Sequence, residues 1–245
     1  RWIPKLLDDP SLELRREAVA RQLDEGATAV EAEQTEAAIA SYSTALQYAR
    51  DIDQIETAYD ELRKLGRNVD LPQHFGFITK WHLIGPFDNT DTVGFDRAFP
   101  PEENIDLDAE YAGKDVAVRW QLAESEDDYG KLDLNAILGK ANGVTAYAVA
   151  EFVADEALPV DLRLGCINAN KVWLNGELLM DNHVYHSGSS IDQYVGHGEL
   201  KAGKNTILVK ICQNEQTESW AQDWEFQLRV CDSLGTAILS GDATP

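Results

Sequence analysis

The polar run at residues 213–224, QNEQTESWAQDW, contains the side chains best suited to recognising a ligand. It places Trp220 among amides and carboxylates, and Tyr185 occurs in another predicted loop. Sugar sites use this combination, because an aromatic face stacks on the C–H face of a pyranose while polar groups hydrogen-bond its hydroxyls. We therefore predict a carbohydrate site. Its predicted residues are Trp220, Gln213, Asn214, Glu215, Glu218 and Tyr185.

Trp220 and Trp224 each have a competing structural explanation. Trp224 begins an alternating apolar pattern that continues with Phe226, Leu228 and Val230, which predicts that it lies in a hydrophobic core. Trp220 could simply cover the end of the same fold. A tryptophan that stacks on a ligand has to expose its indole, whereas truncating a core tryptophan costs about 3–5 kcal/mol of stability. The exposure of Trp220 therefore separates the two explanations.

Three patterns resemble catalytic motifs, but none of them supports an enzyme. Residues 198–205 match most of a P-loop, yet Asn205 replaces its Ser/Thr and the neighbouring segments both look like strands. The His- and Ser-rich run 183–192 has no G-x-S-x-G elbow, and triad residues normally come from distant positions. Carboxylates such as Glu215 and Asp223 are too common here for proximity to indicate a glycosidase pair. We therefore predict a protein that is not an enzyme and has no catalytic cofactor.

Two Asx-rich turns offer oxygen ligands for a cation. Asp88 and Asp91 lie in the run DNTD, and Asp181 precedes Asn182. Ca²⁺ takes about six to eight oxygen ligands, so these three aspartates are the candidate ligands of a structural Ca²⁺. The alternative is that the same turns only cap their own backbone, as Asx turns in β-sandwiches do.

The composition excludes some partners. The 245-residue chain has a formal net charge of −22, and a surface this acidic repels phosphate backbones. No stretch approaches the ~20 apolar residues of a membrane span, so we predict neither nucleic-acid binding nor membrane insertion. Cys166, Cys212 and Cys231 lack the number and spacing of a disulfide framework or a zinc site, which indicates free thiols.

The chain opens at Arg1 inside a helical pattern, so we interpret it as part of a longer protein. Other domains of that protein are expected partners. The absence of a signal sequence then leaves the compartment open, and we favour an extracytoplasmic one.

Residues 1–72 follow a helical period. Asp9-Pro10 predicts a helix start, Gly26 a helix stop and Gly66 the end of the last helix. IPKLLDDPSLELRREAVARQLDEG resembles one HEAT repeat, and AAIASYSTALQYA followed by IETAYDELRKLG is similar to a tetratricopeptide pair. Because such repeats bury their faces against neighbours, we expect the last units of an array or a helical collar on the next domain.

From about Gly76 the apolar period changes to two. KVWLNGELLM reads as strand, Asn175-Gly176 turn and strand, which is typical of a type I′ hairpin. We therefore predict an α+β multidomain fold: a helical repeat segment at 1–72, then an antiparallel β-sandwich of jelly-roll type at 76–240.

The connecting segments carry further expectations. The acidic, Pro-bearing segment 88–115 predicts a loop that wraps the sandwich. Segment 124–142 is expected to be irregular, with one helical turn at 134–138. The junction at 68–77 has no Gly/Ser tract, so we expect the two halves to pack together.

Four blocks of the second half carry a family resemblance: WHLIGPFDN, FPPE, KVWLNGE and LKAGKNTILVKICQNEQTESWAQDWEFQLRVCD. They resemble a galactose-binding-like jelly roll, similar to carbohydrate-binding modules, that recurs in large bacterial HEAT-repeat proteins and beside predicted glycosidases. The resemblance implies a module that binds or braces rather than catalyses. In related sugar-binding modules a loop-edge aromatic contacts the ligand and a structural Ca²⁺ is common. Two functions follow: a glycan-binding module attached to a helical array, or a protein-interaction module that caps and braces the array.

Overall fold

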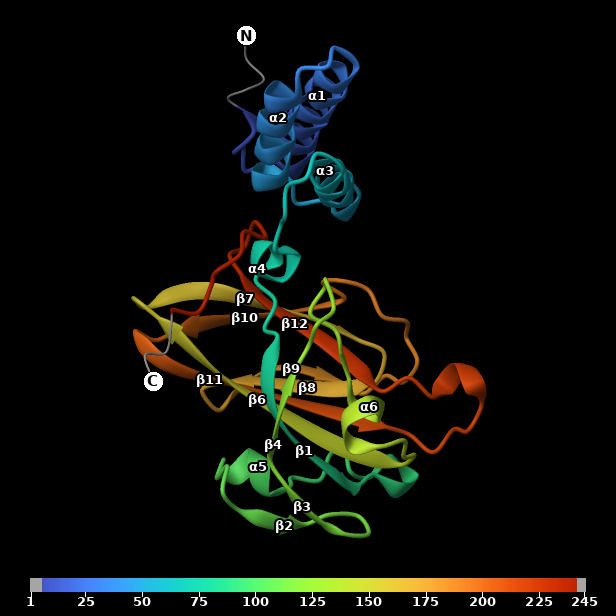
Figure 1. The fold of residues 1–245 in the computed structure, drawn as a ribbon. Coiled ribbons are helices and arrows are strands. Elements are labelled where there is room, and N and C mark those ends of the chain that lie inside the picture. Colours follow the sequence, from blue (N-terminus) through green and yellow to red (C-terminus); the bar gives the residue numbers. More distant parts are fainter. Residues whose placement is uncertain (1–5, 242–245) are drawn as a thin grey trace. The chain divides into compact units, whose positions relative to one another are not determined.

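The computed structural model describes residues 6–241, in which the three long helices precede the strands and only short helices occur among the strands (Figure 1). They form two compact units. The helical unit extends to Asp70 and includes Leu234–Thr236, and the β unit begins at Leu71. The segment 71–72, which the sequence assigns to the helices, therefore belongs to the β unit. Within 6–241, no helix is long and apolar enough to cross a bilayer.

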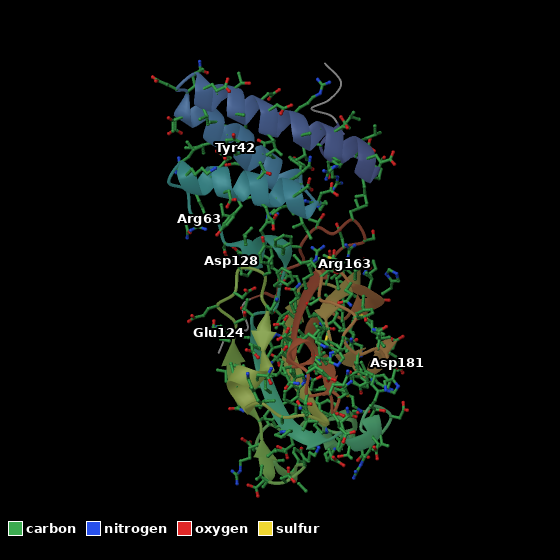
Figure 2. All side chains as sticks on the ribbon, turned by 90° about the vertical axis from the view of Figure 1, so that its right-hand side faces the viewer. Tyr42, Arg63, Glu124, Asp128, Arg163 and Asp181 are labelled. Carbon is green, nitrogen blue, oxygen red and sulfur yellow. The ribbon has the colours of Figure 1, made fainter. Side chains whose placement is uncertain are left out.

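The helical unit consists of α1 (Leu12–Glu31), α2 (Thr35–Tyr48) and α3 (Ile52–Lys64). The predicted helix stop at Gly26 is wrong, because α1 continues through it to Glu31. Gly26 instead allows close packing: a Cβ at this position would lie 2.7 Å from the ring of Tyr42 on α2. Tyr42 is buried among the helices (Figure 2). The predicted end at Gly66 is confirmed by its φ of +79° just after α3.

An array of repeats is not established by these helices, so the HEAT and tetratricopeptide assignments stay predictions. The first part of the HEAT-like run, residues 1–5, lies outside the described residues.

Across the described residues, two large antiparallel sheets form the sandwich of the β unit, and β2 (Glu110–Ala112) and β3 (Ala117–Arg119) form a separate two-stranded sheet. The six-stranded sheet has the order β4 (Gln121–Glu124), β1 (Lys80–Asp88), β6 (Val144–Ala154), β11 (Gly203–Gln213), β8 (Ala169–Leu174), β9 (Glu177–Asn182). The four-stranded sheet has the order β10 (Tyr194–Leu200), β7 (Leu158–Cys166), β12 (Glu225–Cys231), β5 (Leu132–Asp133). The predicted β-sandwich is confirmed in this form.

The main core lies between the two sheets. The alternating residues Ile207, Val209 and Ile211 of β11 are fully buried in it, together with Leu228 and Val230 of β12. Because successive strand residues point to opposite faces, the intervening residues face outward. The type I′ hairpin is also confirmed, since Asn175 and Gly176 both have positive φ between β8 and β9.

A second apolar cluster covers the outer face of the six-stranded sheet. Ile84, Phe87, Tyr147 and Leu208 from the sheet pack there with Phe99 from the segment predicted to be a loop. The simple loop prediction for 88–115 is therefore incomplete. The segment contains η2 (Thr90–Thr92), α5 (Pro100–Glu103) and β2 (Glu110–Ala112), which pairs with β3 (Ala117–Arg119). The hairpin contacts β1 through β3, and Figure 1 shows α5 near the hairpin.

Short helices also break the prediction that helices end near residue 72. They are α4 (Leu71–Phe75), α5, α6 (Leu134–Leu138) and the 3-10 helices η2 and η3 (Ser219–Ala221). The helical turn at 134–138 was expected, and Asp133 caps it by accepting from the Asn135 backbone N–H at 2.8 Å.

The three cysteines are free and buried, as predicted. Cys212 and Cys231 lie on β11 and β12, which belong to different sheets rather than to one hairpin. Burial raises the pKa of all three thiols, to about 12 for Cys166 and about 11 for Cys212 and Cys231. The thiols are therefore protonated and inert near neutral pH.

Candidate functional site

The predicted ligand residues gather where two long connections meet at one end of the sandwich. The first connection joins β9 to β10 and carries Tyr185 and His186, and the second joins β11 to β12 and carries η3. The imidazole of His186 contacts the indole of Trp220 edge-on, with ring centroids 5.2 Å apart and planes at 83°. We call this region, residues 185–186 and 213–220, the Trp220 edge.

Trp220 presents its indole to solvent. The residue is 59% exposed, although it lies on η3 beside Ala221, which is fully buried. Trp224, four residues later, is fully buried and its Nε1 donates to the Ile211 carbonyl at 3.3 Å. The two tryptophans therefore fit different explanations. Trp224 belongs to the core, and Trp220 has the exposure that stacking on a ligand requires.

Gln213 anchors the connection between β11 and β12 to the interior of the sandwich. Its side chain is almost fully buried, with Nε2 donating to the Ala221 carbonyl at 2.9 Å and Oε1 accepting from Asn168 at 3.0 Å. Both ends of the amide are therefore occupied. The expectation that Gln213 contacts ligand directly is corrected by this geometry, which assigns it to positioning η3.

Asn214 links the two connections. Its Nδ2 donates to Gln216 at 2.8 Å, so its Oδ1 is the atom that faces Nε2 of His186 at 3.1 Å. This amide orientation makes His186 Nε2 the hydrogen-bond donor. His186 Nδ1 is buried and has no partner among the described residues. The contact holds the imidazole against the indole.

Glu215 and Glu218 differ in how available they are. Glu215 accepts from the Asp91 backbone N–H at 2.9 Å, whereas the exposed Glu218 carboxylate has no hydrogen bond or ion pair within the described residues. A shallow depression of ≈ 450 Å³ lies along this stretch and is lined by Thr92 and residues 214–218. Glu218 is thus the predicted acid most open to a ligand.

Tyr185 supports the edge from the sandwich side. It is half-buried, and its hydroxyl accepts from Asn89 Nδ2 at 3.1 Å. Burial raises its pKa to about 12, so the hydroxyl remains protonated at neutral pH. Its ring lies 6.3 Å from that of His186. Tyr185 therefore lies beside His186, and its hydroxyl can still donate one hydrogen bond.

His186 is one site residue that sequence reasoning missed, because the His- and Ser-rich run 183–192 was weighed only as a catalytic motif. Its place beside Trp220 results from the packing of two connections that are far apart in sequence. Asn168 is a second example, since its side chain reaches both Gln213 and the Asp223 carbonyl at 3.0 Å. No local spacing in the sequence marks either residue.

The candidate Ca²⁺ ligands do not converge. Asp88 accepts from the Thr90 hydroxyl at 2.6 Å, and this hydrogen bond, with Lys114 3.5 Å away, lowers the pKa of Asp88. Asp181 pairs with Lys171 at 3.1 Å on β8–β9. Across residues 6–241, no three His, Cys, Asp or Glu side chains form a group that could hold a metal. Asp88 also accepts from the Thr90 backbone N–H at 3.2 Å, as the backbone-capping alternative predicts, and a structural Ca²⁺ stays a prediction.

Comparison with known proteins places the fold in context. No protein-family model and no curated protein matches the chain. A β-glucosidase from Kluyveromyces marxianus is 13% identical over 62% of this chain and 17% of its own, with a TM-score of 0.39. A family 35 carbohydrate-binding module from Clostridium thermocellum is 12% identical over 36% of this chain and 72% of its own, with a TM-score of 0.27.

An anti-sigma factor domain-containing protein from Clostridium clariflavum is also similar, at 10% identity over 68% of this chain and 49% of its own, with a TM-score of 0.35. The chain spans only 11% and 17% of the two Kluyveromyces marxianus β-glucosidase structures it matches. At these identities and TM-scores the likenesses carry no argument about function, which has to rest on the geometry of the Trp220 edge.

Proposed function

We propose that this chain is a non-catalytic module that binds uncharged glycans at the Trp220 edge. The observation that carries the proposal is the exposure of Trp220, 59% for the residue, on a connection that buried hydrogen bonds hold in place. An exposed tryptophan on a mobile loop would lose much of its stacking energy to ordering the loop. Here Gln213 and His186 supply that order before a ligand arrives.

The polar groups around the indole suit sugar hydroxyls. Glu218 offers an acceptor that has no other partner within the described residues, and the hydroxyl of Thr217 is exposed beside it. Carboxylate acceptors and hydroxyls form the hydrogen bonds that orient a pyranose above an aromatic face. The depression of ≈ 450 Å³ at 214–218 lies on the same connection as Trp220, although Trp220 does not line it.

Charge narrows the ligand class to uncharged glycans. Glu215, Glu218 and Asp223 all lie on the connection that carries Trp220, and the whole chain has a formal net charge of −22. This field repels carboxylated or sulfated sugars and lowers their local concentration. A neutral glycan meets no such cost.

A glycan array tests the proposal directly. We expect the purified chain to bind one or more neutral glycans and to bind uronate-containing or sulfated glycans more weakly at low salt, because electrostatic repulsion is strongest there. A Leu122→Ala variant should bind the same glycans as the unmodified chain, since Leu122 is 67% exposed on the edge strand β4, outside the Trp220 edge. An array without any neutral hit, or with only anionic hits, would overturn the proposal.

A further inference from the structure

A second groove, of ≈ 420 Å³, lies on the β unit, and no residue that lines it belongs to the Trp220 edge. One wall is α5 with the following residues Asn104 and Ile105, and the other is the turn between β8 and β9. Trp173 and Leu208 form part of its lining. They are paired across β8 and β11 and pack on the outer apolar cluster, so they lie on the outer face of the six-stranded sheet. We call this the Trp173 groove.

A buried ionic network fixes one wall of the groove. Lys210 is 1% exposed, and its Nζ donates to the carbonyls of Phe95 and Arg97 at 2.9 and 2.8 Å and to Glu102 of α5 at 2.8 Å. Tyr147 donates to the same oxygen of Glu102. With three acceptors around one ammonium, the charge is fully compensated. The network attaches α5 to the sheet.

The opposite wall is equally well held. Asn175 Nδ2 donates to Asn205 at 2.8 Å, and Asn175 Oδ1 accepts from the Thr206 backbone N–H at 3.0 Å. The amide of Asn175 therefore stabilises the turn and is not available to a ligand. Both walls of the Trp173 groove are thus rigid, which reduces the entropy that a ligand would have to overcome.

Four other polar side chains that line the groove remain open. Within residues 6–241, the side chains of Glu103, Asn104, Lys201 and Thr206 make no hydrogen bond or ion pair. They supply an ammonium and an amide as donors, a carboxylate as an acceptor and a hydroxyl as either. The half-buried indole of Trp173 lies between these walls. Fixed walls with free donors and acceptors around an indole make a ligand site with unused hydrogen-bonding capacity.

We propose that the Trp173 groove is a second site for uncharged oligosaccharides. Its ligand class rests on the proposed function, whereas its location rests on the groove alone. The free groups are one cation, Lys201, and one anion, Glu103, so the groove itself is close to neutral, while the net charge of −22 on the chain repels anions. A volume of ≈ 420 Å³ falls in the range of small-molecule sites, about 300–1,000 Å³.

Nitrogen-15 NMR of the tryptophan indoles can examine both sites in one titration. The chain has six tryptophans, and Trp173→Phe and Trp220→Phe variants identify the two relevant indole signals. The probes are neutral tetrasaccharides of β-linked glucose, xylose, mannose and galactose, with tetragalacturonate as the anionic comparison. We expect at least one neutral tetrasaccharide to shift the Trp173 signal saturably, and tetragalacturonate to leave it unchanged.

Two wall variants test the free polar groups without touching the core. Asn104→Ala and Lys201→Ala each remove an exposed side chain and should weaken the Trp173 response about two- to tenfold, as the loss of one or two ligand hydrogen bonds does. Lys140→Ala is the matched control, because Lys140 is an exposed lysine outside the groove that has no ion pair within the described residues. It should leave the response unchanged.

The outcomes separate the two sites. If a neutral tetrasaccharide shifts the Trp220 signal alone, the proposal that the Trp173 groove binds oligosaccharides is refuted, and the proposed function of the Trp220 edge is supported. If it shifts the Trp173 signal alone, binding at the groove is supported and glycan binding at the Trp220 edge is refuted. Movement of neither signal overturns both, and a Trp173 response to tetragalacturonate instead of the neutral probes overturns the ligand class of the groove.

Discussion

Asp192 is the residue whose ionisation should matter most for stability. It lies between two arginines: Arg229 donates to it from Nε and Nη2 at 2.6 and 2.5 Å, and Arg163 donates from Nη1 at 2.9 Å. Arg163 comes from β7 of the four-stranded sheet (Figure 2). Burial alone would raise the pKa of Asp192, but the hydrogen bonds and charges of Arg229 and Arg163 outweigh it and lower the pKa.

The direction of this shift sets a pH dependence. A carboxyl with a lowered pKa in the folded state adds stability that is complete above its usual value of 3.8 and disappears as the pH falls through the folded value. Asp192→Asn should lower the free energy of unfolding at neutral pH by about 2 kcal/mol, less than the 3–5 kcal/mol of a fully buried pair. Asparagine also tolerates the φ of +60° at this position.

Urea unfolding at pH values from neutral to below the usual carboxyl pKa measures this effect. The difference between native and Asp192→Asn chains should shrink as the pH falls through the folded pKa of Asp192. A difference that stays constant or grows on acidification would show that the ion pairs contribute nothing through the charge of Asp192.

At the scale of elements, α1 depends on a close approach to α2. A glycine inside a helix normally weakens it, so replacing glycine by alanine at an exposed interior position stabilises the helix by about 1 kcal/mol. A Cβ at Gly26 lies 2.7 to 2.9 Å from three atoms of the Tyr42 ring, which is too near. Gly26→Ala should therefore destabilise the helical unit by about 1–3 kcal/mol.

Thermal unfolding followed by far-ultraviolet circular dichroism checks the sign. The double variant Gly26→Ala/Tyr42→Leu serves as the control, because it removes the ring that a new Cβ would meet. The melting temperature of its helices should differ less from that of Tyr42→Leu than the melting temperature of Gly26→Ala differs from that of the native chain. A stabilised Gly26→Ala chain would contradict the packing described for α1 and α2.

Elements with strong local signals were predictable, and elements defined by distant contacts were not. The Asn175-Gly176 hairpin and the end at Gly66 follow from residues that tolerate positive φ. The helix stop at Gly26 failed because glycine is also used for close packing, which only the partner Tyr42 reveals. β2 and β3 have three residues each, too few to show an alternating pattern.

The candidate site shows the same division. Trp220 was predictable because it is an aromatic residue in a polar connection, and Trp224 because it begins an alternating pattern. The roles of Gln213 and His186 were not, since each depends on a partner from another strand or connection. Local sequence shows which side chains are available, and the tertiary fold decides which of them face solvent.

At the scale of the whole molecule, the start of the β unit is tied into the sandwich. Val230 donates to the Gly76 carbonyl and Ile78 donates to the Leu228 carbonyl, both at 2.9 Å. Phe75 and Phe77 are buried with their ring centroids 5.4 Å apart. Residues 75–78 therefore behave as part of the sandwich and not as a linker.

Limited proteolysis should reflect this arrangement. We expect slow cleavage within 75–78, because a protease needs extended backbone that is free of such hydrogen bonds. The sequence also predicts that the two halves pack together. If they do, cleavage at 66–70 should be slow as well. Rapid release of a stable fragment by a cut at 66–70 would refute that packing, and rapid cleavage within 75–78 would refute the attachment described above.

The central claim, that Trp220 is a glycan platform, is tested most directly by measuring affinity and melting temperature together for Trp220→Ala. Calorimetric titration with the strongest neutral hit of the array should show at least a tenfold weaker affinity, about 1.4 kcal/mol. The melting temperature should change little, because substitutions of exposed side chains usually alter stability by about 0.5 kcal/mol or less. Unchanged affinity, or a large fall in melting temperature, would contradict the claim.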